Sequence, residues 1–238
     1  MTVELIAFVA LALAGSLVAA VFGFGSALIV LTAGPYLIPV TDAIALSAVL
    51  FGASTLTKTL LYWRQIDWKI VAVMAVASVP FAYLGAELVS VINPEVLRRM
   101  LAVMILLYLT LDTFDLIPRF KIGMAGLIGG SAAYGFASGL MGTGSLIKVV
   151  MFREMNISKQ AFVGAMAASS VLASFSKIVS YSRANLLHAD MMPVILALVV
   201  MAVAAALIGR RFLLHLSTRG FEIGLRIILA IMAAGLLF

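Results

Sequence analysis

The feature that most constrains this chain is a series of long apolar stretches that recurs from one end to the other. Eight strong stretches are separated by short polar connections, at residues 3–34, 43–62, 70–92, 96–117, 122–150, 160–181, 191–209 and 221–238. An α-helix needs about 20 apolar residues to cross the hydrocarbon core of a bilayer. The pattern therefore predicts an all-α polytopic membrane protein, with residues 1–238 forming a single transmembrane domain.

The composition agrees with this prediction. Of the residues, 64% are hydrophobic and 11% are charged, whereas soluble domains average roughly 45–50% and about 25%. The net charge of +6 would suggest a nucleic-acid partner in a soluble protein. Here most lysines and arginines flank the apolar stretches, as they do in cytoplasmic loops of membrane proteins, so we expect none. The absence of cysteine excludes disulfides and thiolate metal sites.

A spacing of 119 residues relates rare residues in the two parts of the chain. Six pairs share it: Gly23 and Gly142, Gly25 and Gly144, Ser26 and Ser145, Lys58 and Lys177, Tyr62 and Tyr181, and Arg64 and Arg183. Several of these residue types are uncommon in membrane helices, so chance is a poor explanation. The spacing predicts an internal duplication, with repeats at about 3–117 and 122–238.

The two longest stretches, 3–34 and 122–150, exceed the length of one simple crossing, and each contains a glycine interruption. If each long stretch crosses out and back, every half has five elements and the halves are inverted. If each crosses once, every half has four helices and the halves are parallel. With three lysines inside apolar stretches set aside, the first model divides the remaining cations ten to three, and the second divides them eight to five.

The positive-inside rule therefore favours ten elements in two inverted five-helix repeats, with both termini outside. The parallel arrangement of four plus four helices stays as the alternative, because residues 26–38 are short for a full crossing and could form a re-entrant loop.

The glycine interruptions are the first candidate site. They read Phe22-Gly23-Phe24-Gly25-Ser26 and Met141-Gly142-Thr143-Gly144-Ser145. A helix that restarts inside the membrane exposes unpaired N–H groups, equivalent to about +0.5 charge. Broken helices whose positive ends face an anionic substrate recur in transporters built from inverted repeats. We therefore expect both glycine pairs and both serines to contact a substrate; close helix packing by small residues is the alternative.

Lys58 and Lys177 are the second candidate site. A lysine deep in a bilayer costs about 2.5–3.5 kcal/mol on an insertion scale, so its presence at both related positions favours a binding role. The alternative is snorkelling of the ammonium to the interface. Secondary candidates are Arg64 and Arg183, which can also be interface anchors, and Asp42, which can also cap a helix beginning at Ala43.

Nothing in the sequence predicts catalysis, a metal site or a cofactor. Two histidines, His188 and His215, lack partners at metal-ligand spacing, and no nucleophile triad or phosphate-binding loop occurs. We therefore do not expect an enzyme.

Together, the broken first helices, the duplicated module and the short hydrophobic chain resemble the sulfite exporter TauE/SafE permeases. The resemblance covers residues 15–238, although the glycine runs are shorter and Pro35 has Glu154 as its equivalent. It implies a secondary transporter of sulfite, organosulfonates or related small anions in a bacterial cytoplasmic membrane. Expected partners are the anion, a coupling proton or sodium ion, and lipid. A passive anion channel and a membrane scaffold or sensor without flux are the alternatives.

Overall fold

All regular structure in the described part of the chain is helical. The computed structural model describes residues 3–23, 26–93, 95–97, 99–100, 103, 110, 123–153, 158–217, 219–220 and 224. Five stretches are long and apolar enough to cross a membrane: Val3–Phe22, Val40–Leu61, Trp68–Val89, Lys159–Arg183 and Ala189–His215. The prediction of a polytopic α-helical membrane protein is confirmed. The ten-element inverted arrangement stays a prediction, because most of 96–117 and 221–238 lies outside the described residues.

The first long apolar stretch forms two helices rather than one. Helix α1 (Val3–Phe22) is followed by Gly23, and α2 (Ser26–Ala33) leads into the short 3-10 helix η1 (Gly34–Tyr36). Gly23 has φ +86°, a left-handed conformation that glycine adopts without steric cost. At about 1.5 Å per residue, α2 is roughly 12 Å long, which is too short to cross the bilayer core alone.

Glycine contacts show that α2 and η1 run back along α1. A Cβ atom on Gly15 would lie 3.2 Å from the backbone oxygen of Ser26, and one on Gly34 would lie 2.8 Å from the ring of Phe8. Helices α2 and η1 therefore run antiparallel to α1. The two helices form a hairpin whose tip is Gly23.

A second hairpin consists of α6 (Met124–Met141) and α7 (Ser145–Arg153). Its tip, Gly142, has φ +74°. A Cβ on Gly144 would lie 2.6 Å from the backbone oxygen of Tyr134, and one on Gly130 would lie 2.9 Å from Sδ of Met151. Helix α7 therefore folds back along α6 in the same way.

Helices α3 (Val40–Leu61) and α8 (Lys159–Arg183) are the most buried of the spanning helices. They pack antiparallel. A Cβ on Gly52, near the middle of α3, would lie 3.1 Å from Ile178, and one on Gly164, near the start of α8, would lie 2.9 Å from Tyr62, just after the end of α3. The end of α3 therefore meets the start of α8, and the two helices form the centre of the molecule.

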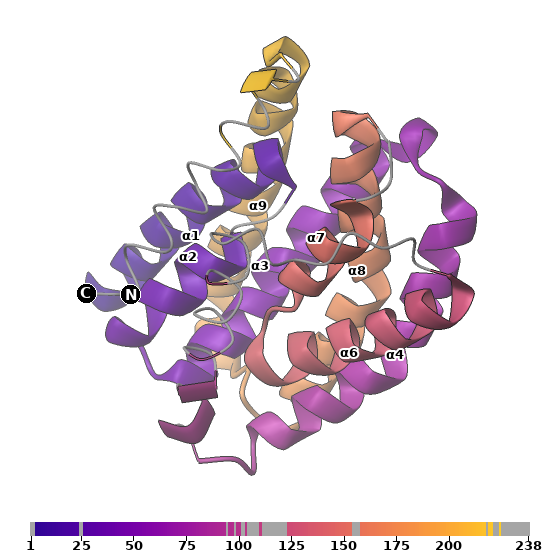
Figure 1. The fold of residues 1–238 in the computed structure, drawn as a ribbon. Helices are drawn as coiled ribbons and strands as arrows, with labels where there is room; N and C mark the ends of the chain where they lie inside the picture. Colours follow the sequence, from indigo (N-terminus) through magenta and orange to yellow (C-terminus); the bar gives the residue numbers. More distant parts are fainter. Residues whose placement is uncertain are drawn as a thin grey trace.

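The outer helices α4 (Trp68–Val89) and α9 (Met192–His215) each pack on the first helix of the other half of the chain, α4 against α6 and α9 against α1 (Figure 1). Glycines permit the α4–α6 contact. A Cβ on Gly135 would lie 2.2 Å from the backbone oxygen of Ser78, and one on Gly139 would lie 2.1 Å from that of Ala82. These glycines mark a helix-packing surface of the kind common in membranes.

The end of α3, the start of α8 and the end of α9 meet at one end of the molecule. The Lys159 ammonium, at the start of α8, donates to the backbone oxygens of Leu213, at 2.7 Å, and Leu216, and so caps the end of α9. Tyr62 packs beside them, ahead of the 3-10 helix η2 (Trp63–Gln65). Arg183 ends α8, roughly 37 Å away by helix length.

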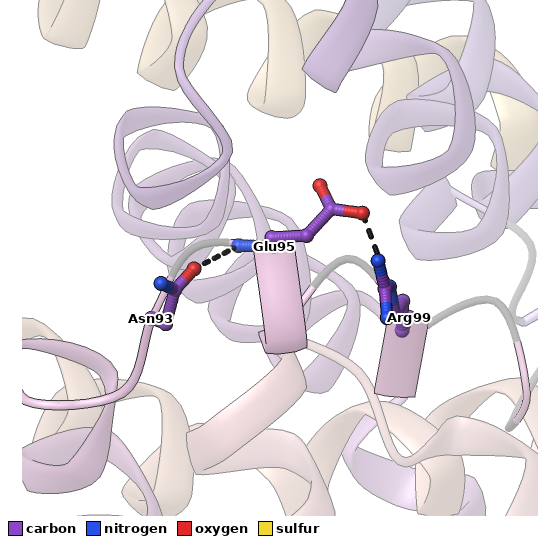
Figure 2. A network of polar contacts seen from close by, with 3 residues as sticks. All are labelled: Asn93, Glu95 and Arg99. Atoms are coloured by element: carbon purple, nitrogen blue, oxygen red, sulfur yellow. Dashed lines mark hydrogen bonds and ion pairs between the residues drawn. The ribbon is translucent and has the colours of Figure 1, made fainter.

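Beyond α4, a small polar network lies on the surface (Figure 2). Asn93 Oδ1 accepts from the backbone N–H of Glu95 at 2.8 Å, and Arg99 Nε lies 3.1 Å from Glu95 Oε1. This is the one ion pair among the described residues, and it is exposed. Surface pairs of this spacing contribute about 0.3–0.5 kcal/mol, so the network is a local feature away from the interior.

Candidate functional site

A cavity lined mainly by buried residues lies between the two hairpin tips and the central helices α3 and α8. Its volume is about 60 Å³. The described residues lining it are Gly23, Ser26, Phe51, Ser54, Thr55, Lys58, Tyr134, Ser138, Gly142, Thr143, Gly144, Ser145, Lys148, Met166, Ser170, Ser174 and Lys177.

The structure brings together seven of the eight main candidates that the sequence predicts. Those that line this one cavity are Gly23, Ser26, Lys58, Gly142, Gly144, Ser145 and Lys177. The eighth, Gly25, lies outside the described residues. Residues from the two halves of the chain, about 119 positions apart, thus form a single polar site.

The two predicted lysines point inward. Side chains that snorkel would expose their ammonium groups, but Lys58 is 3% exposed and Lys177 2%. Lys58 Nζ donates to the backbone oxygen of Ala19 at 3.3 Å. Lys177 Nζ donates to Ser138 Oγ at 2.9 Å and to the backbone oxygen of Gly142 at 3.4 Å. Ala19 and Ser138 are themselves 119 residues apart, so the two lysines make related contacts.

Both broken helices start at the cavity wall. Ser26 and Ser145 are the first residues of α2 and α7. The first four N–H groups of a helix have no partner inside it, and they carry partial positive charge. The Ser145 hydroxyl also lies 3.3 Å from that of Thr143. Two helix starts therefore add positive potential and hydroxyl groups to the same small space.

Lys148 is a third buried cation that the sequence analysis did not select as a candidate. It lies on α7 and is 1% exposed. Its ammonium donates to the backbone oxygen of Met166 at 2.6 Å, to Ser169 Oγ at 3.2 Å and to Ser170 Oγ, and it lies 4.4 Å from the ring centroid of Tyr134. The signal available was a lysine inside an apolar stretch, which is costly by itself.

Hydroxyl side chains that the sequence does not single out complete the lining. They are Ser54, Thr55, Tyr134, Ser138, Thr143, Ser170 and Ser174. Serine and threonine are common in membrane helices, where they often bond to the preceding turn, so their type alone gives no signal. Their position at the crossing of α3, α6 and α8 becomes visible only in the folded chain.

The secondary candidates lie elsewhere. Arg64 is exposed in η2, and Arg183 is exposed and donates to the hydroxyl of Tyr83 at 3.2 Å. Asp42 is half-buried in the first turn of α3. The expectation that it caps a helix beginning at Ala43 is wrong, because α3 already begins at Val40. None of the three lines the cavity.

The ionisable side chains of lysine outnumber those of aspartate and glutamate in the described lining of the cavity. Three lysines line it, and none of the described lining residues is acidic. No group of three or more histidine and carboxylate side chains that could hold a metal ion occurs within the described residues. A lysine ammonium has three N–H donors and no acceptor. Such a site can bind a small anion that presents several oxygens.

Comparisons with known proteins give one match. The comparison with curated proteins found none, and neither did the comparison with solved structures. The model of the family described as sulfite exporter TauE/SafE matches residues 7–236, which includes both hairpins and all three cavity lysines. That family consists of membrane transporters of sulfur anions rather than enzymes, and its multi-pass character agrees with the helices described above. The chain belongs to the sulfite exporter TauE/SafE family.

Proposed function

We propose that this protein is a secondary transporter that binds sulfite, an organosulfonate or a related sulfur oxyanion in the three-lysine cavity, between the hairpin tips. The observation that carries the proposal is the convergence of three buried lysine side chains on one cavity whose described lining includes no carboxylate. Burying unpaired charge is unfavourable, since the desolvation penalty is several kcal/mol per ion. An anion in the cavity would offset that penalty.

The lysines at the two related positions have donors to spare for such an anion. Lys58 makes one hydrogen bond, at 3.3 Å, and Lys177 makes two, one of them at 3.4 Å. Each ammonium can donate three, so at least one N–H of each is available to a ligand. Charge-assisted bonds to an oxyanion are shorter and about twice as strong as neutral ones.

The size of the cavity agrees with a small ligand. The cavity volume of about 60 Å³ restricts the ligand to a small ion, such as one with three or four oxygens around one sulfur atom. The starts of α2 and α7 offer backbone N–H groups from opposite hairpins, as in other anion sites at helix starts. We propose that the ligand bridges these helix starts and the two lysines.

We further propose that the cavity lies between duplicated halves, at about 3–117 and 122–238, that are inverted in the membrane. Two observations support this proposal. Helices α3 and α8, which the spacing of 119 relates, pack antiparallel. The outer helices also exchange partners, since α4 packs on α6 and α9 on α1. In a ten-element arrangement in the bacterial cytoplasmic membrane, both termini lie outside.

The test is uptake of sulfite and organosulfonates into proteoliposomes by lysine variants. Lys58→Met and Lys177→Met should each weaken anion affinity at least tenfold, since each removes a charge-assisted bond of roughly 1.5–3 kcal/mol. Lys58→Arg and Lys177→Arg should restore only part of it, because the guanidinium is a planar fork on a different stem. Lys69→Met, at an exposed lysine of α4, is the matched control and should change nothing.

The outcomes separate the alternatives. Wild-type affinity in both methionine variants would remove these lysines from the site. High conductance without coupling to a proton or sodium gradient would indicate a passive channel, and folded protein without any flux would indicate a scaffold or sensor.

A further inference from the structure

We propose that Lys148 selects the valence of the bound anion, as a fixed third positive charge that favours a doubly charged oxyanion over a singly charged one. This inference rests on the proposed function, because it assumes that an anion occupies the three-lysine cavity. The proposed function gave Lys148 no role of its own. Lys148 does not donate to the ligand, and no lysine occupies the related position in the other half of the chain.

The contacts of Lys148 favour a protonated amine. Its three hydrogen-bond partners are the backbone oxygen of Met166 and the hydroxyl oxygens of Ser169 and Ser170. Both hydroxyl hydrogens are directed elsewhere, from Ser169 to the backbone oxygen of Ala165 at 2.8 Å and from Ser170 to that of Met166 at 2.9 Å. In this arrangement all three partners accept hydrogen bonds from Lys148. A neutral amine has two N–H groups and would leave a lone pair facing one of these oxygens, whereas an ammonium fills all three.

The ring of Tyr134 adds to the same preference. Lys148 Nζ lies 4.4 Å from the ring centroid, within the distance at which an aromatic face attracts a cation. A neutral amine would lose this attraction. The socket formed by Tyr134, Met166, Ser169 and Ser170, which we call the Lys148 socket, thus holds a positive charge against the cavity wall.

The filled donors of Lys148 distinguish it from the other two lysines. Lys58 and Lys177 have N–H groups available for a ligand, whereas Lys148 donates all three of its N–H groups to protein oxygens. Lys148 therefore acts on an anion through its charge rather than by a hydrogen bond. Coulomb energy is proportional to the charge of the ligand, so this attraction is twice as large for a dianion as for a monoanion.

The Lys148 socket belongs to one half of the chain only. At the positions 119 residues earlier, Lys148 is matched by Ile29 and Tyr134 by Gly15, while Ser169 and Ser170 are matched by Leu50 and Phe51. The lysine and its polar side-chain partners thus differ together between the halves. Symmetry alone would give the cavity two lysines, and the third charge is an addition with its own supporting residues.

The experiment compares two probes of similar shape and different charge, sulfate and methanesulfonate, as competitors of sulfite flux in proteoliposomes of the full chain. Wild-type protein should bind sulfate at least tenfold more tightly than methanesulfonate. Lys148→Gln removes the charge and keeps two N–H donors. It should weaken sulfate binding far more than methanesulfonate binding, and lower the ratio of the two affinities at least tenfold.

Lys159→Gln is the matched control. Lys159 also donates to backbone oxygens, but of α9 and away from the cavity, so its loss should leave the ratio of affinities unchanged. A purely structural role for Lys148 would weaken both probes equally, which the ratio detects.

Failure of the proposed function can be distinguished from failure of the valence inference alone. If neither probe competes with sulfite in the wild type and the Lys58→Met and Lys177→Met variants transport normally, the proposed function fails and this inference with it. If those variants lose affinity while Lys148→Gln keeps the wild-type ratio, only the valence inference is overturned. Should Lys148→Gln fail to fold, Lys148→Met is compared with the wild type in the same way, and an unchanged ratio of the two affinities in that variant would refute the inference.

Discussion

Replacing Gly139 by alanine should disturb both the α4–α6 contact and the cavity behind it. A Cβ on Gly139 would lie 2.1 Å from the backbone oxygen of Ala82, whereas real Cβ contacts are essentially never below 3.0 Å, so the helices must separate by about 0.9 Å. The clash is with main chain, and no side-chain rotation relieves it. Overpacking of this kind costs about 1–3 kcal/mol.

The change also reaches the site. The neighbouring Ser138 accepts from Lys177 at 2.9 Å, and the backbone oxygen of Gly139 accepts from the hydroxyl of Tyr181. If α6 moves by the required distance, the Lys177 contact exceeds hydrogen-bond length. We therefore expect the Gly139→Ala variant to lose about 2 kcal/mol of stability, or about 4–8 °C in Tm for a chain of this size, together with anion affinity.

Gly129→Ala is the matched control in the same helix. A Cβ there would meet nothing within 4 Å, and Gly129 is exposed. Both substitutions gain the helix preference of alanine over glycine, about 0.5–1 kcal/mol, so their difference isolates the clash. Thermal unfolding in detergent and sulfite competition in proteoliposomes measure the two effects. Equal Tm values for the two variants would refute the argument from close helix approach.

Two further predictions concern topology and a buried hydroxyl. Single cysteines at the exposed Arg64 and Arg210 positions should react with an impermeant thiol reagent from one side of the membrane, and a cysteine at the Arg183 position should react from the other side. Labelling of the Arg64 and Arg210 positions from opposite sides would contradict the inverted model. The Tyr62 hydroxyl is buried without a hydrogen-bond partner, so Tyr62→Phe should be neutral or stabilising. Burial raises the pKa of the Tyr62 hydroxyl to about 12, although Arg210 acts to lower it. The free energy of unfolding of the wild type should therefore fall relative to that of the Phe variant as the pH rises from 10 to 12. Unfolding free energies that stay parallel over this pH range would contradict the prediction.

Much of the candidate site could be predicted because its main residues occur twice. Lys58 and Lys177 stand out as lysines in apolar stretches, and their spacing of 119 residues pairs them without any structure. Gly23 and Gly142 are paired in the same way, and both have the positive φ that permits a hairpin tip. A repeat thus converts a weak single signal into a strong double one.

The rest depends on packing that a linear pattern does not contain. Lys148 has no lysine partner at the same spacing, so a search for repeats passes over it. Ser138 and Ser170 line the cavity because α6 and α8 cross beside it, and a serine in any membrane helix looks the same in the sequence. The short α2 was the ambiguous element. Only its contacts with α1 show that the chain turns back there.

The position of the three lysines has a consequence for where this protein obtains its stability. Their desolvation opposes folding, and the hydrogen bonds to Ala19, Ser138 and Met166 compensate only in part. The compensating interactions lie farther out, where Gly135 and Gly139 let α4 and α6 meet backbone to backbone. The anion that we propose for the cavity would bind the folded chain and not the unfolded one, so it would also stabilise the fold by mass action. Under the proposed function, Lys58 and Lys177 keep free N–H donors in the absence of an anion, and these donors attract the next one.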